Sequence, residues 1–115
     1  MIERGSRCIR ATRLDLSDEK RAQRMLAESF EAAGLPFQRE LRLAPGDIVD
    51  FLVDGIAVEL KLRGTPKVAI YRQLRRYATY ARVEAIVLAS NLAMGLPAEI
   101  EGKPAYLVSL GRAWL

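Results

Sequence analysis

The sequence contains no histidine and only one cysteine, Cys8, among its 115 residues. Without histidine the chain cannot use Ser-His-Asp or Cys-His catalysis, ligate haem through histidine or build most zinc enzymes. A single cysteine also excludes an internal disulfide and a multi-cysteine zinc site. Any catalytic chemistry would therefore depend on carboxylates, lysine, hydroxyl groups or a hard metal ion.

Long apolar runs are missing as well. No run approaches the ~20 residues of a transmembrane helix, and the first residues lack the apolar stretch of a signal peptide. Half of the residues are apolar and 28% are charged, which is typical of a globular domain rather than a disordered tail. We therefore expect one domain with its own core, in the cytoplasm and without a membrane partner.

The positive charge is concentrated in one part of the chain. The net charge is +4, but residues 61–82 contain seven basic residues and no acid. A concentration of one sign indicates a surface for an anionic partner, although a solvated helix face is the alternative. The seven residues are Lys61, Arg63, Lys67, Arg72, Arg75, Arg76 and Arg82.

The periodicity of apolar residues predicts a mixed α/β domain. Residues 1–16 carry an arginine at every third position from Arg4 to Arg13, which fits neither period, so we predict a basic N-terminal arm or a short element there. Residues 17–115 form the single domain. The predicted elements are a helix over 18–33 capped by Ser17 or Asp18, strands over 37–43, 48–53 and 56–62, a helix over 66–81 capped by Thr65, a buried strand over 85–89 and a strand over 105–110. Because a crossover helix makes a right-handed connection, strand 85–89 should lie parallel to strand 56–62.

The strands over 48–53 and 56–62 carry the first candidate site. Asp54-Gly55 between them is typical of a two-residue type I′ hairpin, which pairs Asp50 with Glu59. On this register one face is wholly apolar and packs on the core, and the other presents Asp50, Glu59 and Lys61. The apolar face comprises Val49, Phe51, Val53, Ile56, Val58, Leu60 and Leu62.

Two facing carboxylates beside a lysine suit phosphodiester hydrolysis. Directly opposed residues have Cβ atoms ~5 Å apart, so the two acids repel each other unless they hold a divalent cation such as Mg²⁺ or Mn²⁺. Lys61 can orient a water molecule or stabilise negative charge on a phosphate. An exposed ion pair of Lys61 with Asp50 or Glu59 is the alternative interpretation. Asp47 competes with Asp50 as the first acid, but the alternation along the strand favours Asp50.

Three segments resemble the PD-(D/E)xK nuclease superfamily. They are Gly46-Asp47-Ile48-Val49-Asp50, Val58-Glu59-Leu60-Lys61 and Gln73-Leu74-Arg75-Arg76-Tyr77. The Gln-x-x-x-Tyr spacing is similar to that of the recombination-exonuclease and lambda-exonuclease-like branch. The resemblance covers residues 18–90 and implies a restriction-endonuclease-like core, α-β-β-β-α-β, with a mixed central sheet flanked by helices. Val49 departs from the pattern, since it stands where the superfamily often has proline.

The resemblance also implies roles for individual residues. Asp50, Glu59 and the backbone carbonyl of Leu60 would bind Mg²⁺ or Mn²⁺, and Lys61 would position the attacking water. Gln73 would assist catalysis, and Tyr77 would contact the substrate. Many relatives add a Glu or Gln from the first helix, for which Glu19 and Gln23 are the candidates; Glu40 is another unranked acid.

The leading hypothesis is a metal-dependent deoxyribonuclease acting on duplex or branched DNA, either an exonuclease or a structure-selective endonuclease. A basic surface would hold the DNA, and a homo-oligomer would enlarge this small interface. A catalytically inactive nucleic-acid-binding module of the same fold is the alternative. Ser90-Asn91, at the end of strand 85–89, could also approach a ligand or be ordinary loop residues. The predicted nucleic-acid contacts are Arg63, Lys67, Arg72, Arg75, Arg76 and Tyr77.

Overall fold

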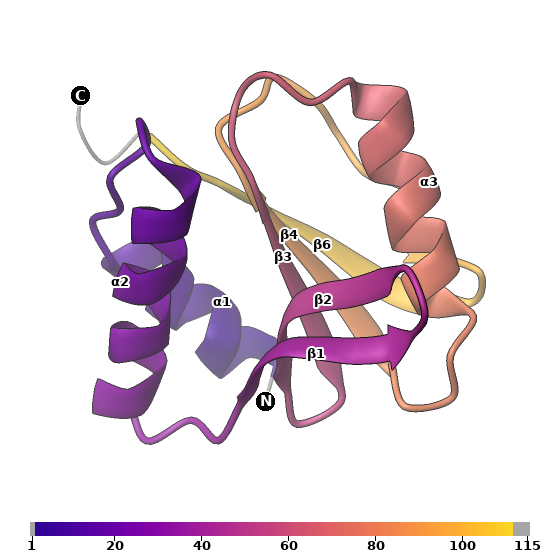
Figure 1. Cartoon of the computed structure of the whole chain (residues 1–115), viewed down its shortest axis with the longest axis horizontal. Helices are drawn as coiled ribbons and strands as arrows, with labels where there is room; N and C mark the ends of the chain where they lie inside the picture. Colours follow the sequence, from indigo (N-terminus) through magenta and orange to yellow (C-terminus); the bar gives the residue numbers. More distant parts are fainter. Residues whose placement is uncertain (1, 112–115) are drawn as a thin grey trace.

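A computed structural model describes residues 2–111 of the protein. In this part of the chain two helices are followed by three strands, a third helix and three more strands (Figure 1). The elements are α1 (Ile2–Ala11), α2 (Glu19–Ala32), β1 (Gln38–Ala44), β2 (Asp47–Val53), β3 (Ile56–Lys61), α3 (Lys67–Ala78), β4 (Ala85–Ser90), β5 (Glu99–Ile100) and β6 (Lys103–Ser109).

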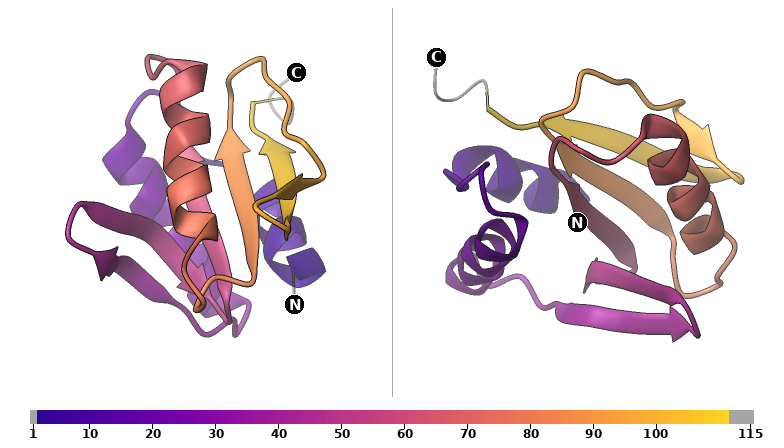
Figure 2. Two further views of the ribbon diagram at one scale, coloured as in Figure 1. Left: turned by 90° about the vertical axis from the view of Figure 1, so that its right-hand side faces the viewer. Right: turned by 45° about the horizontal axis from the view of Figure 1, so that its top comes forward.

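The six strands form one mixed sheet in the order β1-β2-β3-β4-β6-β5. Neighbouring strands are antiparallel from β1 to β3 and parallel from β3 through β4 to β6, so the predicted parallel crossover is confirmed. Helices α1 and α2 cover one face and α3 covers the other (Figure 2). The centre of the sheet is therefore buried on both faces, which explains the continuous apolar run of β4.

The core on the α1/α2 side is built around aromatic rings. Asp18 caps α2 by accepting a hydrogen bond from the Arg21 N–H, as predicted. The helix then buries Leu26 and Phe30 on its inner face. The rings of Phe30 and Phe51 meet edge to face with centroids 5.3 Å apart, a favourable aromatic geometry. This packing fixes α2 against β2 and β3.

The turn between β2 and β3 has the predicted form. Asp54 (φ 50°) and Gly55 (φ 84°) are both in the left-handed region, as a type I′ turn requires. The register pairs Val53 with Ile56 and Phe51 with Val58. The ladder stops there, however, so the predicted backbone pairing of Asp50 with Glu59 is absent.

A bend in the β1–β2 hairpin explains why the ladder stops. Glu40 of β1 has a φ of 50° and lies where the register would place a partner for Asp50, between the pairs Arg39–Phe51 and Leu41–Val49. A left-handed residue in a strand interrupts the alternation of side chains in the way a bulge does. The prediction that Val49 shares the core face of Phe51 is wrong, because Val49 packs under α3 instead. The outer half of the hairpin, which contains the turn between β1 and β2, consequently lies toward α3 (Figure 1).

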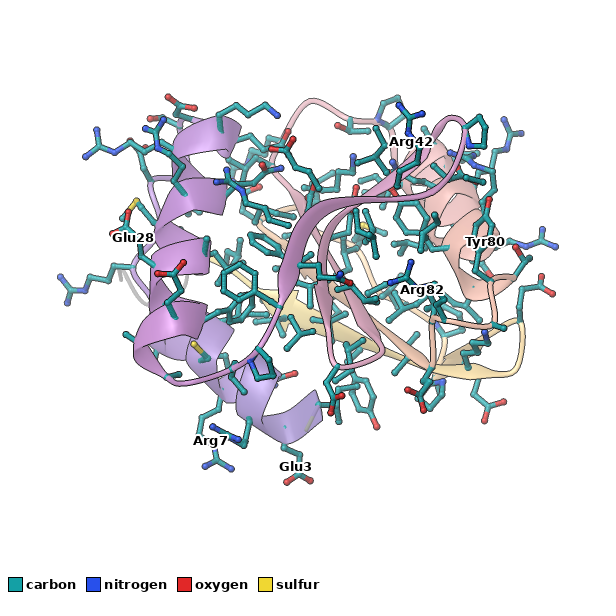
Figure 3. All side chains as sticks on the ribbon, turned by 60° about the horizontal axis from the view of Figure 1, so that its bottom comes forward. Glu3, Arg7, Glu28, Arg42, Tyr80 and Arg82 are labelled. Atoms are coloured by element: carbon teal, nitrogen blue, oxygen red, sulfur yellow. The ribbon has the colours of Figure 1, made fainter. Side chains whose placement is uncertain are left out.

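The segment before α2 is helical. Helix α1 buries Ile9 between α2 and the sheet, whereas Glu3 and Arg7 point away from the body of the protein (Figure 3). The Thr12 hydroxyl, just after α1, donates to the Cys8 carbonyl at 2.8 Å and accepts a hydrogen bond from the Ser29 hydroxyl of α2 at 2.7 Å. The apolar pattern did not predict this helix, because its buried face contains only one large apolar residue, Ile9, beside Gly5 and Ser6.

Smaller differences concern the ends of elements. Helix α3 spans Lys67–Ala78 rather than 66–81, and its N-cap is Pro66 without a side-chain hydrogen bond, so Thr65 does not cap it. The last long strand covers Lys103–Ser109, and the two-residue β5 was not predicted. Within residues 2–111, no helix is long and apolar enough to cross a membrane.

Candidate active site

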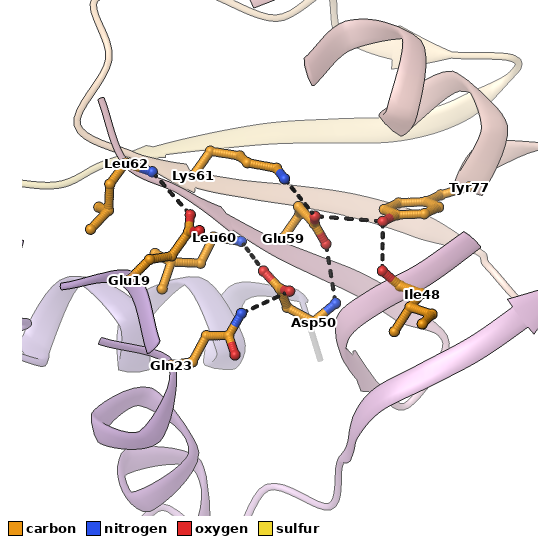
Figure 4. A network of polar contacts seen from close by, with 9 residues as sticks. All are labelled: Glu19, Gln23, Ile48, Asp50, Glu59, Leu60, Lys61, Leu62 and Tyr77. Atoms are coloured by element: carbon orange, nitrogen blue, oxygen red, sulfur yellow. Dashed lines mark hydrogen bonds and ion pairs between the residues drawn. The ribbon is translucent and has the colours of Figure 1, made fainter. Parts of the chain in front are cut away.

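Asp50 and Glu59 lie where β2 separates from β3, and their carboxylates replace the missing ladder bonds. The Asp50 N–H donates to Glu59 Oε1 at 3.1 Å, and the Leu60 N–H donates to Asp50 Oδ2 at 2.8 Å (Figure 4). Each acid is therefore fixed by the backbone of the opposite strand. The two predicted acids are brought together, although by side-chain rather than ladder contacts.

Helix α2 approaches the acids from one side. Gln23 Nε2 donates to Asp50 Oδ1 at 2.9 Å (Figure 4). Gln23 is only 5% exposed, and its Oε1 is buried without a hydrogen-bond partner. Glu19 lies one turn earlier and accepts a hydrogen bond from the Leu62 N–H at 3.3 Å. Of the three open candidates, Gln23 touches the acid pair, Glu19 lies beside it, and Glu40 is exposed at the hairpin bend.

Lys61 and helix α3 approach from the other side. Lys61 Nζ lies 3.3 Å from Glu59 Oε2. The Tyr77 hydroxyl donates to the Ile48 carbonyl at 2.8 Å and lies 3.5 Å from Glu59 Oε2 (Figure 4). The Tyr77 ring is fully buried, so this residue packs in the core and reaches the site only through its hydroxyl. Gln73 is half-buried on α3, and the structure gives it no hydrogen bond to the acids or to Lys61.

Burial dominates the electrostatics of the pair. Glu59 is 2% exposed, and loss of hydration raises the pKa of its carboxyl group well above the ordinary value; the nearby charge of Asp50 raises it further and Lys61 lowers it. Burial likewise raises the pKa of Asp50, against the opposing effects of the Leu60 N–H and Lys61. Without a cation, the pair therefore retains a proton to a higher pH than either acid alone would.

Asp47, the competing first acid, belongs to a separate cluster. Its Oδ1 accepts a hydrogen bond from Arg76 Nε at 2.9 Å, and its Oδ2 accepts one from the Tyr80 hydroxyl at 2.6 Å. The Tyr80 hydrogen bond, followed by that of Arg76, lowers the pKa of Asp47. This cluster ties the outer half of the hairpin to α3, and Asp47 does not join the Asp50–Glu59 pair.

The predicted basic surface divides into two groups. Arg76 pairs with Asp47, and Arg75 pairs with Glu101 at 2.9 Å, but both arginines are more than half exposed. The Arg75–Glu101 pair is exposed on both sides and contributes little, so Arg75 can exchange Glu101 for a phosphate. Asp47 is buried, so Arg76 stays with the cluster described above. The second group has no ion pair among the residues described and consists of Arg63, Lys67 and Arg72, all exposed.

Substitution Tyr77→Phe is expected to destabilise the protein by about 1 kcal/mol, because Ile48 loses its hydrogen-bond donor beside the buried Glu59. Urea unfolding checks this value. Tyr71→Phe is a matched control on the same helix, since the structure shows no hydrogen bond for the Tyr71 hydroxyl. Equal stabilities for the two variants would contradict a role for the Tyr77 hydroxyl in holding β2.

Sequence reasoning left the Gln23–Asp50 contact undecided and missed the Ile48–Tyr77 contact. The signal for Gln23 was its position beside the apolar stripe of Ala22 and Leu26, whereas a backbone acceptor such as Ile48 leaves no sequence signal. The groups brought together are two carboxylates, the Gln23 side-chain amide and one ammonium group; no third carboxylate or thiol joins the pair among the described residues. Comparisons with protein-family models, curated proteins and solved structures find no match to this chain.

Proposed function

We propose that this protein is a metal-dependent nuclease that hydrolyses DNA phosphodiester bonds, built on a restriction-endonuclease-like core that runs from α2 to β4. One observation carries the proposal: the buried Glu59 carboxylate and the partly buried Asp50 carboxylate share a hydrogen-bonded site with the Lys61 ammonium group. Burying two like charges side by side destabilises a protein unless a cation or a proton compensates. Strongly raised pKa values in such a cluster favour a functional site over a structural one.

The residues present fit Mg²⁺ or Mn²⁺. Asp50 and Glu59 supply charged oxygens, and Mg²⁺ commonly uses one or two carboxylates together with substrate phosphate. The Leu60 N–H points to Asp50, and since the N–H and C=O of one strand residue face the same edge, the Leu60 carbonyl faces this site too.

Lys61, Glu59, Asp50 and Gln23 would each have a separate role beside the metal ion. A bound divalent cation would polarise the phosphodiester and lower the pKa of a coordinated water. Lys61 would hold the attacking water or balance the negative charge that develops on the phosphate. Glu59 holds the Lys61 ammonium group in place, and the Asp50 N–H in turn orients Glu59. Gln23 orients Asp50 from α2.

The DNA would lie across the basic surface beside this site. Arg63, Lys67 and Arg72 are exposed cations suited to backbone phosphates, which position DNA without reading its sequence. Specific DNA-binding modules bury upward of ~600 Å² of protein surface, a large share for so small a domain. A homo-oligomer would enlarge that contact and add a second active site.

The proposal is tested by incubating the protein with linear, circular, single-stranded and branched DNA in Mg²⁺, Mn²⁺ or EDTA. Cleavage is expected only with a divalent cation. Lys61→Met keeps most of the side-chain volume but removes the ammonium group, so cleavage should fall by about 10²-fold or more. Salt-dependent binding without cleavage of any substrate would favour the inactive nucleic-acid-binding module instead.

A further inference from the structure

A pocket of about 970 Å³ lies at the carboxyl ends of the parallel strands β3, β4 and β6. Carboxyl ends of parallel strands are where α/β sheets bind ligands, and the volume falls within the range of roughly 300–1,000 Å³ found for ligand pockets. None of the residues proposed to act on the phosphodiester bond is needed to form it. The residues that matter for its chemistry are Leu62, Thr65, Ser90, Asn91, Leu92 and Met94.

The pocket lies next to the site formed by Asp50, Glu59 and Lys61. Ser90, in its wall, is the register partner of Lys61 across β3 and β4. Leu62 follows Lys61 in the chain and also lines the pocket. Glu19, whose carboxylate accepts the Leu62 N–H, forms part of the same wall (Figure 4). A ligand in this pocket would therefore lie next to a phosphate held at Asp50 and Glu59.

The lining combines apolar surface, uncharged hydrogen-bonding groups and two charged side chains, Glu19 and Arg63. Leu62, Leu92 and Met94 offer apolar contact. The amide oxygen of Asn91 is buried and has no hydrogen-bond partner. The fully buried Ser90 hydroxyl accepts the Leu92 N–H at 3.0 Å, which leaves its own proton free to donate. The apolar and uncharged groups suit a flat ring with donors and acceptors at its edge, as in a nucleobase, and Arg63 suits the phosphate that a nucleotide carries.

We propose that this pocket receives an unpaired nucleotide of the DNA strand being cut, adjacent to the scissile phosphate. The inference rests on the proposed nuclease function and narrows its substrate class. A base inside a duplex is stacked and paired, so it can enter a pocket only after costly extrusion, whereas an unpaired base enters without that cost. The protein therefore prefers DNA with an unpaired nucleotide at the cleavage point over fully paired duplex.

The test compares a blunt duplex with the same duplex carrying a one-nucleotide overhang of 2-aminopurine, both in EDTA to prevent cleavage. Binding of the overhang should change the 2-aminopurine fluorescence. Ala93→Trp fills the pocket from an exposed position, and Asn91→Leu removes the buried acceptor. Each variant should bind the overhang DNA about tenfold more weakly, since contacts to one base contribute ~1–3 kcal/mol, and bind the blunt duplex as wild type does. Ala32→Trp, in the groove between α1 and α2, is the matched control.

The outcomes separate this inference from the proposed function. Wild-type cleavage with no effect of Ala93→Trp or Asn91→Leu on either DNA would overturn the pocket and leave the nuclease intact. Equal affinity of the wild-type protein for the overhang DNA and the blunt duplex would also overturn the pocket and leave the nuclease proposal intact. No DNA binding and no cleavage by wild type in any metal would overturn both. Thermal unfolding shows whether each variant is folded. If Asn91→Leu does not fold, Ala93→Trp alone still tests the pocket.

Discussion

Glu59→Gln is expected to reduce metal-dependent DNA cleavage by about 10³-fold or more while raising the thermal stability of the metal-free protein above neutral pH. Glutamine keeps the shape of the side chain and an oxygen for the Asp50 N–H. It removes the charge that we propose holds a cation, and it also removes the repulsion with the Asp50 carboxylate. Activity and stability should therefore move in opposite directions.

Steady-state cleavage and thermal unfolding in EDTA measure the two effects. Glu28→Gln is a matched control, because Glu28 is exposed and points outward from α2 (Figure 3). This control should change neither quantity. A Glu59→Gln variant that cleaves DNA at the wild-type rate, or that is less stable than wild type above neutral pH, would contradict the role given to the acid pair.

The metal-free protein is expected to lose stability as the pH rises from about 5 to 9. The pKa of Glu59 and that of Asp50 are raised in the folded state, so the folded protein binds more protons than the unfolded chain over this range. Their contribution is complete below the unfolded pKa values and is lost as the pH rises through the folded ones. Asp47 has a lowered pKa, so it acts in the opposite sense and only at lower pH.

A divalent cation should reverse this trend. At the proposed metal site it would bind the deprotonated pair, so the stabilisation by Mg²⁺ or Mn²⁺ should grow with pH and with cation concentration. Melting temperatures measured from pH 5 to 9 in EDTA and in Mn²⁺ check the prediction, and a difference of about 5 °C or more is expected at the alkaline end. A flat or rising metal-free profile, or a cation effect independent of pH, would be inconsistent with a coupled acid pair.

Local chemistry made much of the fold predictable. Asp54-Gly55 specifies a type I′ turn, and that turn fixes the register of β2 and β3 for the residues next to it. The register predicted from this turn already places Asp50 of β2 near Glu59 of β3. The apolar run of β4 indicated a strand buried on both faces, and the crossover rule then gave its direction.

The remaining features depend on tertiary contacts that a local pattern does not contain. Strict alternation along β2 put Val49 on the wrong face, because it took no account of the left-handed Glu40 on the neighbouring strand. Helix α1 is marginal by itself and is stabilised by packing against α2 and the sheet. The Gln23 contact depends on how α2 docks, and periodicity shows only which face of a helix is buried.

The exchange of bonds between Asp50 and Glu59 has a consequence for the evolution of this chain. Each carboxylate satisfies a backbone N–H in the place where the sheet opens, so either residue changed to alanine leaves a buried donor unmet at a cost of about 1–3 kcal/mol. A descendant that loses the proposed activity is therefore expected to carry Asn at position 50 and Gln at position 59 rather than alanine. In such descendants, the two amide side chains would mark the positions of the former carboxylates.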